Sequence, residues 1–401
     1  MQQRQFRLLW AGQAISALGD AFAFVAVPLL VLDATGSVVS MGLVSATGVA
    51  AQVATSLVSG AIVDRVDRRR LMILCDLGRT LAYGLVPLCW SMGFHSLPLI
   101  FVMTAVAGAL GNLFGVANIA ALPDVVEKDR LHEANGRLAL SQALAYVLGP
   151  LLAGVVAAHS GPVAALTIDA ATFLVSAASL IFLSFGRGHL ADATRTDRSP
   201  TAGVRYLFRH PAMRALMILV VLLGLTSNVG LSAGIVDLLV FHLKRELGKG
   251  DRDVGVVLGV AAVGAVLGAG LAPRIRRRFG FGPCFLGGTF LQALGLLSMG
   301  AIRAAGFAAF GAFLWAGGLM LRAIASQAFR QEATPPEMLG RAAAAYLTLA
   351  LSASAVGTAL VTRLGSRWGA AHAMTGIGVS VVLIVLLGML TPAAEREPNG
   401  S

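Results

Sequence analysis

The sequence predicts an all-α membrane protein, and this prediction rests on its composition and hydropathy. Of the 401 residues, 57% are hydrophobic and only 13% are charged, and the mean hydropathy is +0.79. Soluble domains carry about a quarter charged residues. Spans this apolar are predicted to be helices, because helices satisfy their own backbone hydrogen bonds in lipid and the alternating pattern of barrel strands is absent.

Twelve apolar windows are each long enough to cross a bilayer of about 30 Å as a helix. They lie at 8–32, 38–62, 71–93, 97–121, 137–158, 162–185, 212–241, 253–273, 281–302, 307–329, 340–362 and 369–390. The first window follows Arg4 and Arg7 and is too long for the core of a signal peptide, so we interpret it as a span. The bilayer is therefore the predicted environment of most of the chain.

The basic residues predict the orientation. Most of the 31 Lys and Arg residues lie in the two terminal segments and in the loops on the same side, which places both termini in the cytoplasm and the protein in the cell membrane. This bias accounts for the formal net charge of +11. Because no basic surface with interleaved aromatic residues is present, nucleic acid is not an expected partner.

A long polar segment that begins at Gly186 separates the twelve windows into two sets of six. The turns after the second and eighth windows, 64–70 and 273–278, are both rich in arginine. We expect an N-terminal six-helix bundle at 1–185, a cytoplasmic linker at 186–211, a C-terminal six-helix bundle at 212–392 and a cytoplasmic tail at 393–401. Duplicated halves of this kind are typical of transporters that alternate access to a site near the midplane.

Three stretches carry a family resemblance. The turn after the second window has the motif Gly60, Asp64, Arg65, Arg68 and Arg69. The other two stretches are the opening segment 6–20 and the segment 121–154, which contains Gly149, Pro150 and Gly154. These stretches resemble the major facilitator superfamily, and more closely its exporter branch, which includes the enterobactin exporter and macrolide efflux pumps. The resemblance implies the major facilitator fold, with two pseudo-symmetric six-helix bundles.

The charged turn has two interpretations. Asp64 and Arg65 either form an interfacial cluster that fixes topology or, as the resemblance implies, belong to a conformational switch in which Asp64 docks against the positive end of a helix in the opposite half. Asp67 stands where the family usually has Gly, and the second-half copy has Pro273 in place of the acidic residue. The switch is therefore expected in the N-terminal half.

Two further charged residues are grouped with this switch. Asp76 and Arg79 lie three residues apart in the third window, on one face of a helix, and are close enough to pair. They form either a local structural pair or part of a gate.

Asp20, Asp169 and Arg322 are candidates for coupling transport to protons. Asp20 lies near the bilayer centre, where a carboxylate costs ~2.5 kcal/mol or more. It either takes up and releases a proton or braces a neighbouring helix. Asp169 is similar to an aspartate of the resembled branch and has the same two interpretations, while Arg322 needs a partner such as Asp20. Asp33 and Asp237, near the outer ends of spans, are expected to be solvated.

Polar and helix-bending residues complete the candidate sites. Four amides lie within predicted spans, where they either form interhelical hydrogen bonds or orient a substrate in a mostly apolar cavity: Asn112, Gln142, Asn228 and Gln292. Gly149, Pro150 and Gly154 resemble a motif of antiporters and predict a bend in the fifth window, with or without a specific function.

The function expected from these observations is transport. The sequence has no Walker-type glycine loop and no metal-ligand spacing among its His and Cys residues, so we expect no enzyme activity, metal or cofactor. We predict a secondary active exporter of a lipophilic or amphipathic small molecule (a drug, antibiotic, siderophore or other secondary metabolite), coupled to protons by alternating access. The alternatives are a proton-independent facilitator or importer, and a non-transporting receptor or scaffold.

Overall fold

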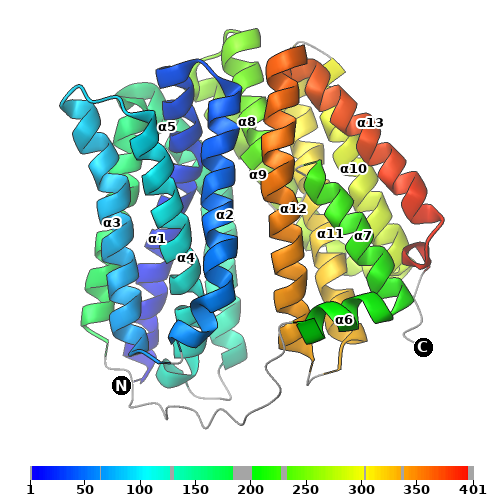
Figure 1. The fold of residues 1–401 in the computed structure, drawn as a ribbon, viewed down its shortest axis with the longest axis horizontal. Coiled ribbons are helices and arrows are strands. Elements are labelled where there is room, and N and C mark those ends of the chain that lie inside the picture. The colour runs from blue at the N-terminus through cyan, green and yellow to red at the C-terminus, as the bar shows by residue number, and fades with distance from the viewer. Residues whose placement is uncertain are drawn as a thin grey trace. The chain divides into compact units, whose positions relative to one another are not determined.

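The computed structural model describes residues 2–63, 65–126, 131–183, 201–226, 233–301, 304–335 and 338–395. The described elements are all helices, which confirms the prediction of an all-α fold. The chain divides into two compact units (Figure 1). Unit 1 comprises Met1–Gly36 and Thr47–Thr196, and unit 2 comprises Ser37–Ala46 and Asp197–Ser401.

Ten helices in the described ranges are long and apolar enough to cross a membrane. Two of the predicted windows share α5 (Leu131–Ile181), which a non-helical residue, Gly161 with φ of 79°, divides into two helices. The seventh window contains α7 (Pro211–Leu225) and α8 (Ala233–Phe241). A total of twelve spans is consistent with this arrangement and stays a prediction.

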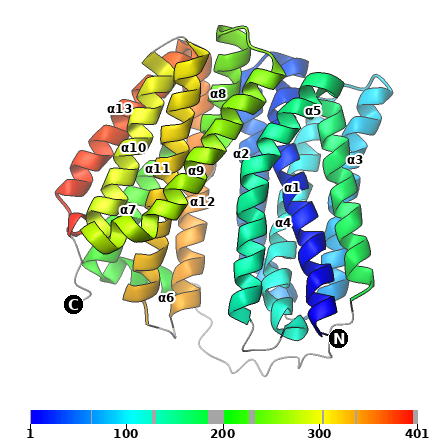
Figure 2. The ribbon, with the colours of Figure 1, turned by 180° about the vertical axis from the view of Figure 1, so that it is seen from behind.

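Unit 1 is built from α1 (Gln2–Thr35), most of α2 (Val38–Val63), α3 (Arg68–Ser91), α4 (Leu97–Val125) and α5. Helix α1 packs along α5, and α3 packs against both α4 and α5 (Figure 2). Apolar side chains from all four of these helices are buried together, among them Leu9, Met72, Phe114 and Leu180. Burial of each such side chain contributes about 1.5–3 kcal/mol, so this shared core holds α1, α3, α4 and α5 at fixed positions.

Unit 2 contains α7, α8, α9 (Asp251–Phe279), α10 (Phe281–Ala301), α11 (Ala305–Ala333), α12 (Leu339–Trp368) and α13 (Ala370–Met389). Helix α11 packs against α9 and α10, and α12 packs against α7. Glycines allow these helices to approach closely. A Cβ atom at Gly268 of α9 would lie 2.2 Å from the backbone oxygen of Gly317 of α11, and one at Gly318 would lie 2.3 Å from that of Gly288 of α10. The hydrophobic effect does not drive helices together in lipid, so the van der Waals contacts that small residues allow stabilise their association.

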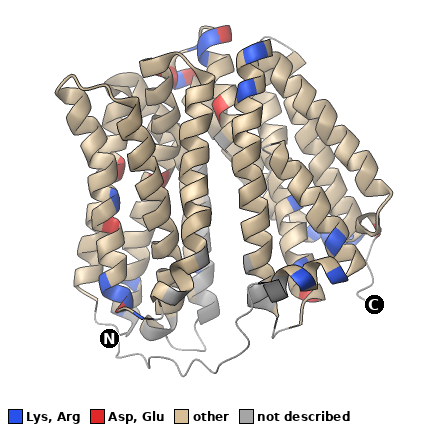
Figure 3. Ribbon diagram, in the orientation of Figure 1, with Lys and Arg blue, Asp and Glu red and all other residues tan. Residues whose placement is uncertain are grey.

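Charged residues gather at helix ends in both units (Figure 3). The segment predicted to be a linker contains a further helix, α6 (Thr201–Arg209), which packs against α12. Leu207 of α6 is buried, and the Tyr206 hydroxyl donates a hydrogen bond to the Ala333 carbonyl oxygen at 2.6 Å. Asp33 is exposed, as expected, but the prediction that Asp237 is solvated is wrong. Asp237 is fully buried because α8 packs against α12 and α13.

The start of α13 is held by a carboxylate from another part of unit 2. Its N-cap residue, Gly369, has no side chain to cap the helix. Glu246 instead accepts hydrogen bonds from the Ala370 and Ala371 backbone N–H groups at 2.6 and 3.3 Å, and its Oε2 lies 2.5 Å from Nδ1 of His242. Burial raises the pKa of Glu246, but the hydrogen bonds from His242 and α13 outweigh burial and lower the pKa below its ordinary value of 4.5.

We therefore expect Glu246→Gln to reduce the stability of the purified protein by about 1 kcal/mol at neutral pH, because a capping carboxylate at the helix N-terminus is lost. The carboxylate contributes stability above the ordinary glutamate pKa, and this contribution disappears as the pH falls through the lower folded-state value. Thermal unfolding in detergent should thus show a difference between the two proteins at pH 7 that narrows below pH 4.5. The exposed Glu395→Gln is the control, and a pH-independent difference would contradict the assignment.

The close approach of α9 and α11 generates a second prediction. Gly268→Ala should destabilise the protein by about 1–3 kcal/mol, because the new Cβ atom would meet rigid backbone and not a movable side chain. Gly270→Ala is the matched control on the same helix, because nothing lies within 4 Å of the corresponding Cβ position. Removing this glycine should leave the melting temperature unchanged or slightly raised. Equal melting temperatures for both variants would contradict the packing.

Candidate functional site

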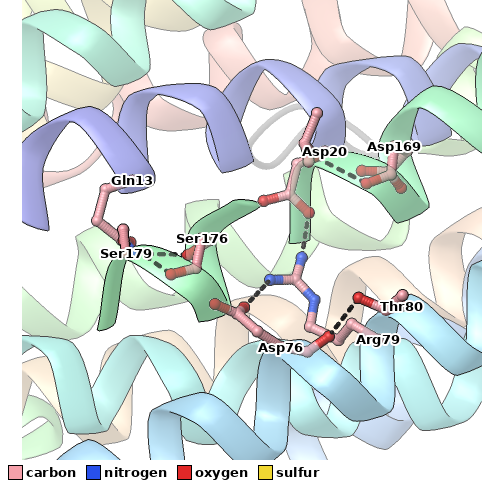
Figure 4. A network of polar contacts seen from close by, with 9 residues as sticks. Gln13, Asp20, Asp76, Arg79, Thr80, Asp169, Ser176 and Ser179 are labelled. Atoms are coloured by element: carbon pink, nitrogen blue, oxygen red, sulfur yellow. Dashed lines mark hydrogen bonds and ion pairs between the residues drawn. The ribbon is translucent and has the colours of Figure 1, made fainter. Parts of the chain in front are cut away.

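Four charged residues from three helices meet inside unit 1 (Figure 4). The Arg79 guanidinium of α3 forms an ion pair with Asp20 of α1 and lies 3.9 Å from Oδ1 of Asp76, three residues earlier on α3. Asp169 of α5 faces the same group and interacts electrostatically with both Asp20 and Arg79. We call these four residues the carboxylate–arginine cluster. The predicted pairing of Asp76 with Arg79 is confirmed.

Local features of three helices bring the cluster together. Helix α3 begins at Arg68, where the carboxylate of the N-cap residue Asp67 accepts a hydrogen bond from the Arg70 N–H at 2.8 Å. Helix α1 approaches α5 closely, because a Cβ atom at Gly149 would lie 2.2 Å from Cβ of Ala21 and leaves no space for a larger residue. Gly149 precedes the break at Gly161 and Asp169 follows it, so a second contact places Asp169. A Cβ atom at Gly19, next to Asp20, would lie 2.6 Å from Oδ1 of Asp169.

Two aromatic residues form one wall of the cluster. The centre of the Arg79 guanidinium lies 3.7 Å from the ring centroid of Phe173, which is a cation–π contact. Tyr83 stacks on Phe173 with ring centroids 6.3 Å apart. The sequence analysis missed both residues, although a spacing signal was present. Phe173 lies four residues after Asp169 and Tyr83 four residues after Arg79, so each shares a helix face with a charged residue of the cluster.

The members of the cluster differ in exposure. The side chains of Asp76 and Asp169 are fully buried, and that of Arg79 is 8% exposed, whereas that of Asp20 is 43% exposed. If all four groups were ionised, the three carboxylates would leave two negative charges in excess of the guanidinium. Uncompensated charge inside a membrane is costly. Asp20 is the least buried of the three carboxyl groups.

Hydroxyl and amide groups extend the network from the cluster. The Thr80 hydroxyl donates to the Asp76 backbone carbonyl oxygen at 2.9 Å. Nε2 of Gln13 on α1 donates to the Ser176 hydroxyl on α5 at 3.4 Å (Figure 4). Ser176 of α5 is buried, and its hydroxyl faces the Asp76 carboxyl group. The Thr80 hydroxyl therefore bonds to the backbone of α3, and the hydrogen bond between Gln13 and Ser176 joins α1 to α5 beside the cluster.

The three proton-coupling candidates do not share one site. Asp20 and Asp169 lie in the carboxylate–arginine cluster of unit 1, and the partner of Asp20 is Arg79. Arg322 lies in unit 2, where it is 2% exposed and its Nε donates a hydrogen bond to Oε1 of Gln292 at 3.0 Å. Gln292, a substrate-cavity candidate, is therefore one residue that the structure brings to Arg322.

At the charged turn between α2 and α3, the arginines that begin α3 form hydrogen bonds to other helices. Asp64 lies outside the described residues, and Gly60 and Arg65 are exposed. Arg68 Nη1 donates to the Ala120 carbonyl oxygen at 3.0 Å, near the end of α4. Arg69 donates to the Leu180 carbonyl oxygen at 2.8 Å and also to that of Ile181, at the end of α5. Both arginines therefore bind carbonyl groups near the C-terminal ends of helices, where positive charge is stabilising.

The remaining candidates are dispersed. Asn112 of α4 donates to the Ser59 hydroxyl of α2 at 3.4 Å, Gln142 is exposed, and Asn228 lies outside the described residues. Residues Gly149, Pro150 and Gly154 are buried on α5. Pro150 lies within the helix, and the non-helical break in α5 occurs at Gly161.

Comparison with known proteins identifies the family. The enterobactin exporter EntS of Citrobacter koseri is 26% identical over 407 residues, with 98% of this chain and 94% of that protein covered. EntS of Salmonella typhi is 26% identical over 411 residues, with the same coverage. Both relatives thus match this chain over nearly its whole length.

Solved structures of transporters share the fold. The nucleoside transporter NupG matches with a TM-score of 0.78 at 10% identity, covering 96% of this chain and 98% of that one. A bacterial homologue of the iron transporter ferroportin matches with a TM-score of 0.71 at 19% identity, covering 97% of each chain. The model of the Major Facilitator Superfamily matches residues 9–358. The chain belongs to the Major Facilitator Superfamily and is a multi-span membrane transporter, not an enzyme.

Proposed function

We propose that this transporter is a secondary active exporter that couples the movement of a lipophilic or amphipathic small molecule to protons. The observation that carries the proposal is the carboxylate–arginine cluster, in which Asp20, Asp76 and Asp169 surround Arg79 within membrane helices. Three carboxyl groups and one guanidinium cannot all be ionised in a low-dielectric environment without a large cost. Binding and release of a proton are the ordinary way to remove such charge.

Asp20 is the group we assign to proton exchange. Its side chain is 43% exposed, whereas those of Asp76 and Asp169 are fully buried. When Asp20 takes up a proton, its ion pair with Arg79 weakens and the guanidinium is attracted more strongly to Asp76 and Asp169. Arg79 lies on α3 and its partners on α1 and α5, so protonation changes the forces between three helices. A transporter needs such a link between proton binding and helix position.

The relatives support the proposed direction and class of substrate. Several proteins that match nearly the whole chain are enterobactin exporters, at 25–26% identity. This supports export of a siderophore or another amphipathic molecule, such as a drug, an antibiotic or a secondary metabolite. In this proposal, six-helix bundles at 1–185 and 212–392 are joined by a cytoplasmic linker at 186–211, and both termini are cytoplasmic, with the tail at 393–401. Alternating access of the two bundles then moves the substrate.

Asp20→Asn should abolish proton-driven transport, because asparagine keeps the shape of the side chain and cannot release a proton. We expect the export of enterobactin or ethidium from proteoliposomes, driven by a pH gradient, to fall about a hundredfold or more, because a positioned proton-transfer group typically contributes about 10²–10⁴-fold. Asp33→Asn is the matched control on α1, because Asp33 is exposed. Transport by Asp20→Asn at the normal rate would remove Asp20 as the proton carrier, and transport that survives collapse of the gradient would favour a proton-independent facilitator.

We retain Asp64 as the proposed conformational switch, on the basis of the motif at Gly60–Arg69. Asp64→Asn should slow or abolish transport while expression and topology stay intact, because a contact worth ~0.3–2 kcal/mol shifts a balanced two-state equilibrium several-fold. The matched control is Asp67→Asn, because asparagine also caps helices and should preserve the start of α3. Normal turnover of the Asp64→Asn variant would show that the turn fixes the topology and is not a conformational switch.

A further inference from the structure

Unit 2 contains a groove between α10 and α13 that none of the sites described above uses. The two helices pack side by side (Figure 2), and the groove between them has a volume of about 440 Å³. Its walls are side chains of both helices, and Ala394 of the short helix η3 (Pro392–Ala394) lines one end. At that end the Gly282 N–H donates a hydrogen bond to the Glu395 carbonyl oxygen at 3.1 Å, which holds η3 against the start of α10.

Close contacts fix the spacing of α10 and α13 on both sides of the groove. A Cβ atom at Gly378 of α13 would lie 2.9 Å from Cγ of Leu297 on α10, and one at Gly388 would lie 2.6 Å from Cδ2 of Leu286. Between these contacts, no atom of the described residues lies within 4 Å of the Cβ position of Gly287. The packing of the two helices therefore leaves open space beside Gly287.

The groove opens toward the hydrocarbon of the membrane. Both α10 and α13 are long and apolar enough to cross a bilayer, and three lining side chains are well exposed, Phe290 at 43%, Leu386 at 52% and Met389 at 59%. The described residues that line the groove are all apolar. A bound water needs two to four polar partners, so hydrocarbon is a better occupant of this space than water.

The length and position of the groove match those of a lipid chain. Pro283 is the third residue of α10 and Phe290 lies seven residues further on, so the groove extends roughly 10 Å along the helix. One leaflet contributes about 15 Å of hydrocarbon. Arg274 and Arg277, which are exposed near the end of α9, mark the membrane boundary beside the start of α10. The groove therefore runs from this boundary into one leaflet.

We propose that this groove binds one acyl chain of a bilayer phospholipid, with the lipid headgroup at the membrane boundary near the start of α10. An amphipathic solute fits less well, because its polar groups need orienting partners and the described lining has no polar side chain. The bound chain fills the space beside Gly287 and contacts both helices. The inference does not depend on the proposed export or proton coupling, because α10, α13 and η3 alone define the groove.

Photolabelling of the purified full-length protein in detergent tests the proposal, with a phosphatidylcholine that carries a diazirine in one acyl chain as the probe. We expect saturable labelling, which peptide mass spectrometry maps to 283–290 and 382–389. Gly287→Phe fills the groove and should weaken this labelling at least about tenfold, because losing the burial of two methylene groups changes an affinity by that factor. Gly376→Phe is the matched control on α13, because Gly376 is exposed, lies outside the groove, and has no atom of the described chain within 4 Å of its Cβ position.

If size-exclusion chromatography shows that Gly287→Phe does not fold, Gly287→Leu fills the same space with a smaller side chain and should also weaken the labelling. Labelling that is not saturable, or that maps to other segments, would overturn the proposal. The same holds if a folded Gly287 variant is labelled like the unmodified protein. Displacement of the probe by enterobactin would also overturn it, because the groove would then bind a solute and not a lipid. Loss of proton-driven transport in a separate assay would remove the proposed function and leave this site intact.

Discussion

The ion pair between Arg79 and Asp20, with Asp76 and Asp169 beside it, is the constraint around which unit 1 is arranged. A guanidinium held among apolar helices is tolerated when carboxylates and an aromatic face surround it. Those partners lie on α1, α3 and α5, so the three helices must stay in contact for the charge to be satisfied. Close packing at Gly19 and the shared apolar core keep these helices together.

Unit 2 also buries charged groups. Arg322 of α11 and Asp237 of α8 are both buried there, and close glycine contacts pack the helices of unit 2 as they do in unit 1. The two units hold different sets of charged groups, although both consist of apolar helices.

Hydropathy was sufficient to predict the helices, because any segment this apolar has few other structures available in lipid. Spacing was sufficient for Asp76 with Arg79, since neighbours on one helix face depend on helix geometry alone. The pairing of Asp20 with Arg79 was not predicted, because it depends on how α1 and α3 pack. The same holds for Gln292 with Arg322, and for the burial of Asp237, which follows from contacts of α8 with α12 and α13. Position along a predicted span gives depth in the membrane but not the direction in which a side chain points.

Arg68 and Arg69 have a consequence for how the charged turn communicates with the interior. They tie the beginning of α3 to the ends of α4 and α5, and α3 and α5 are the helices that carry Arg79 and Asp169. A displacement at the turn would therefore move the ends of two helices that carry charged members of the cluster. In our proposal, a proton bound to the cluster and docking at the turn change each other's free energy by the same amount, because coupling between two binding events is reciprocal.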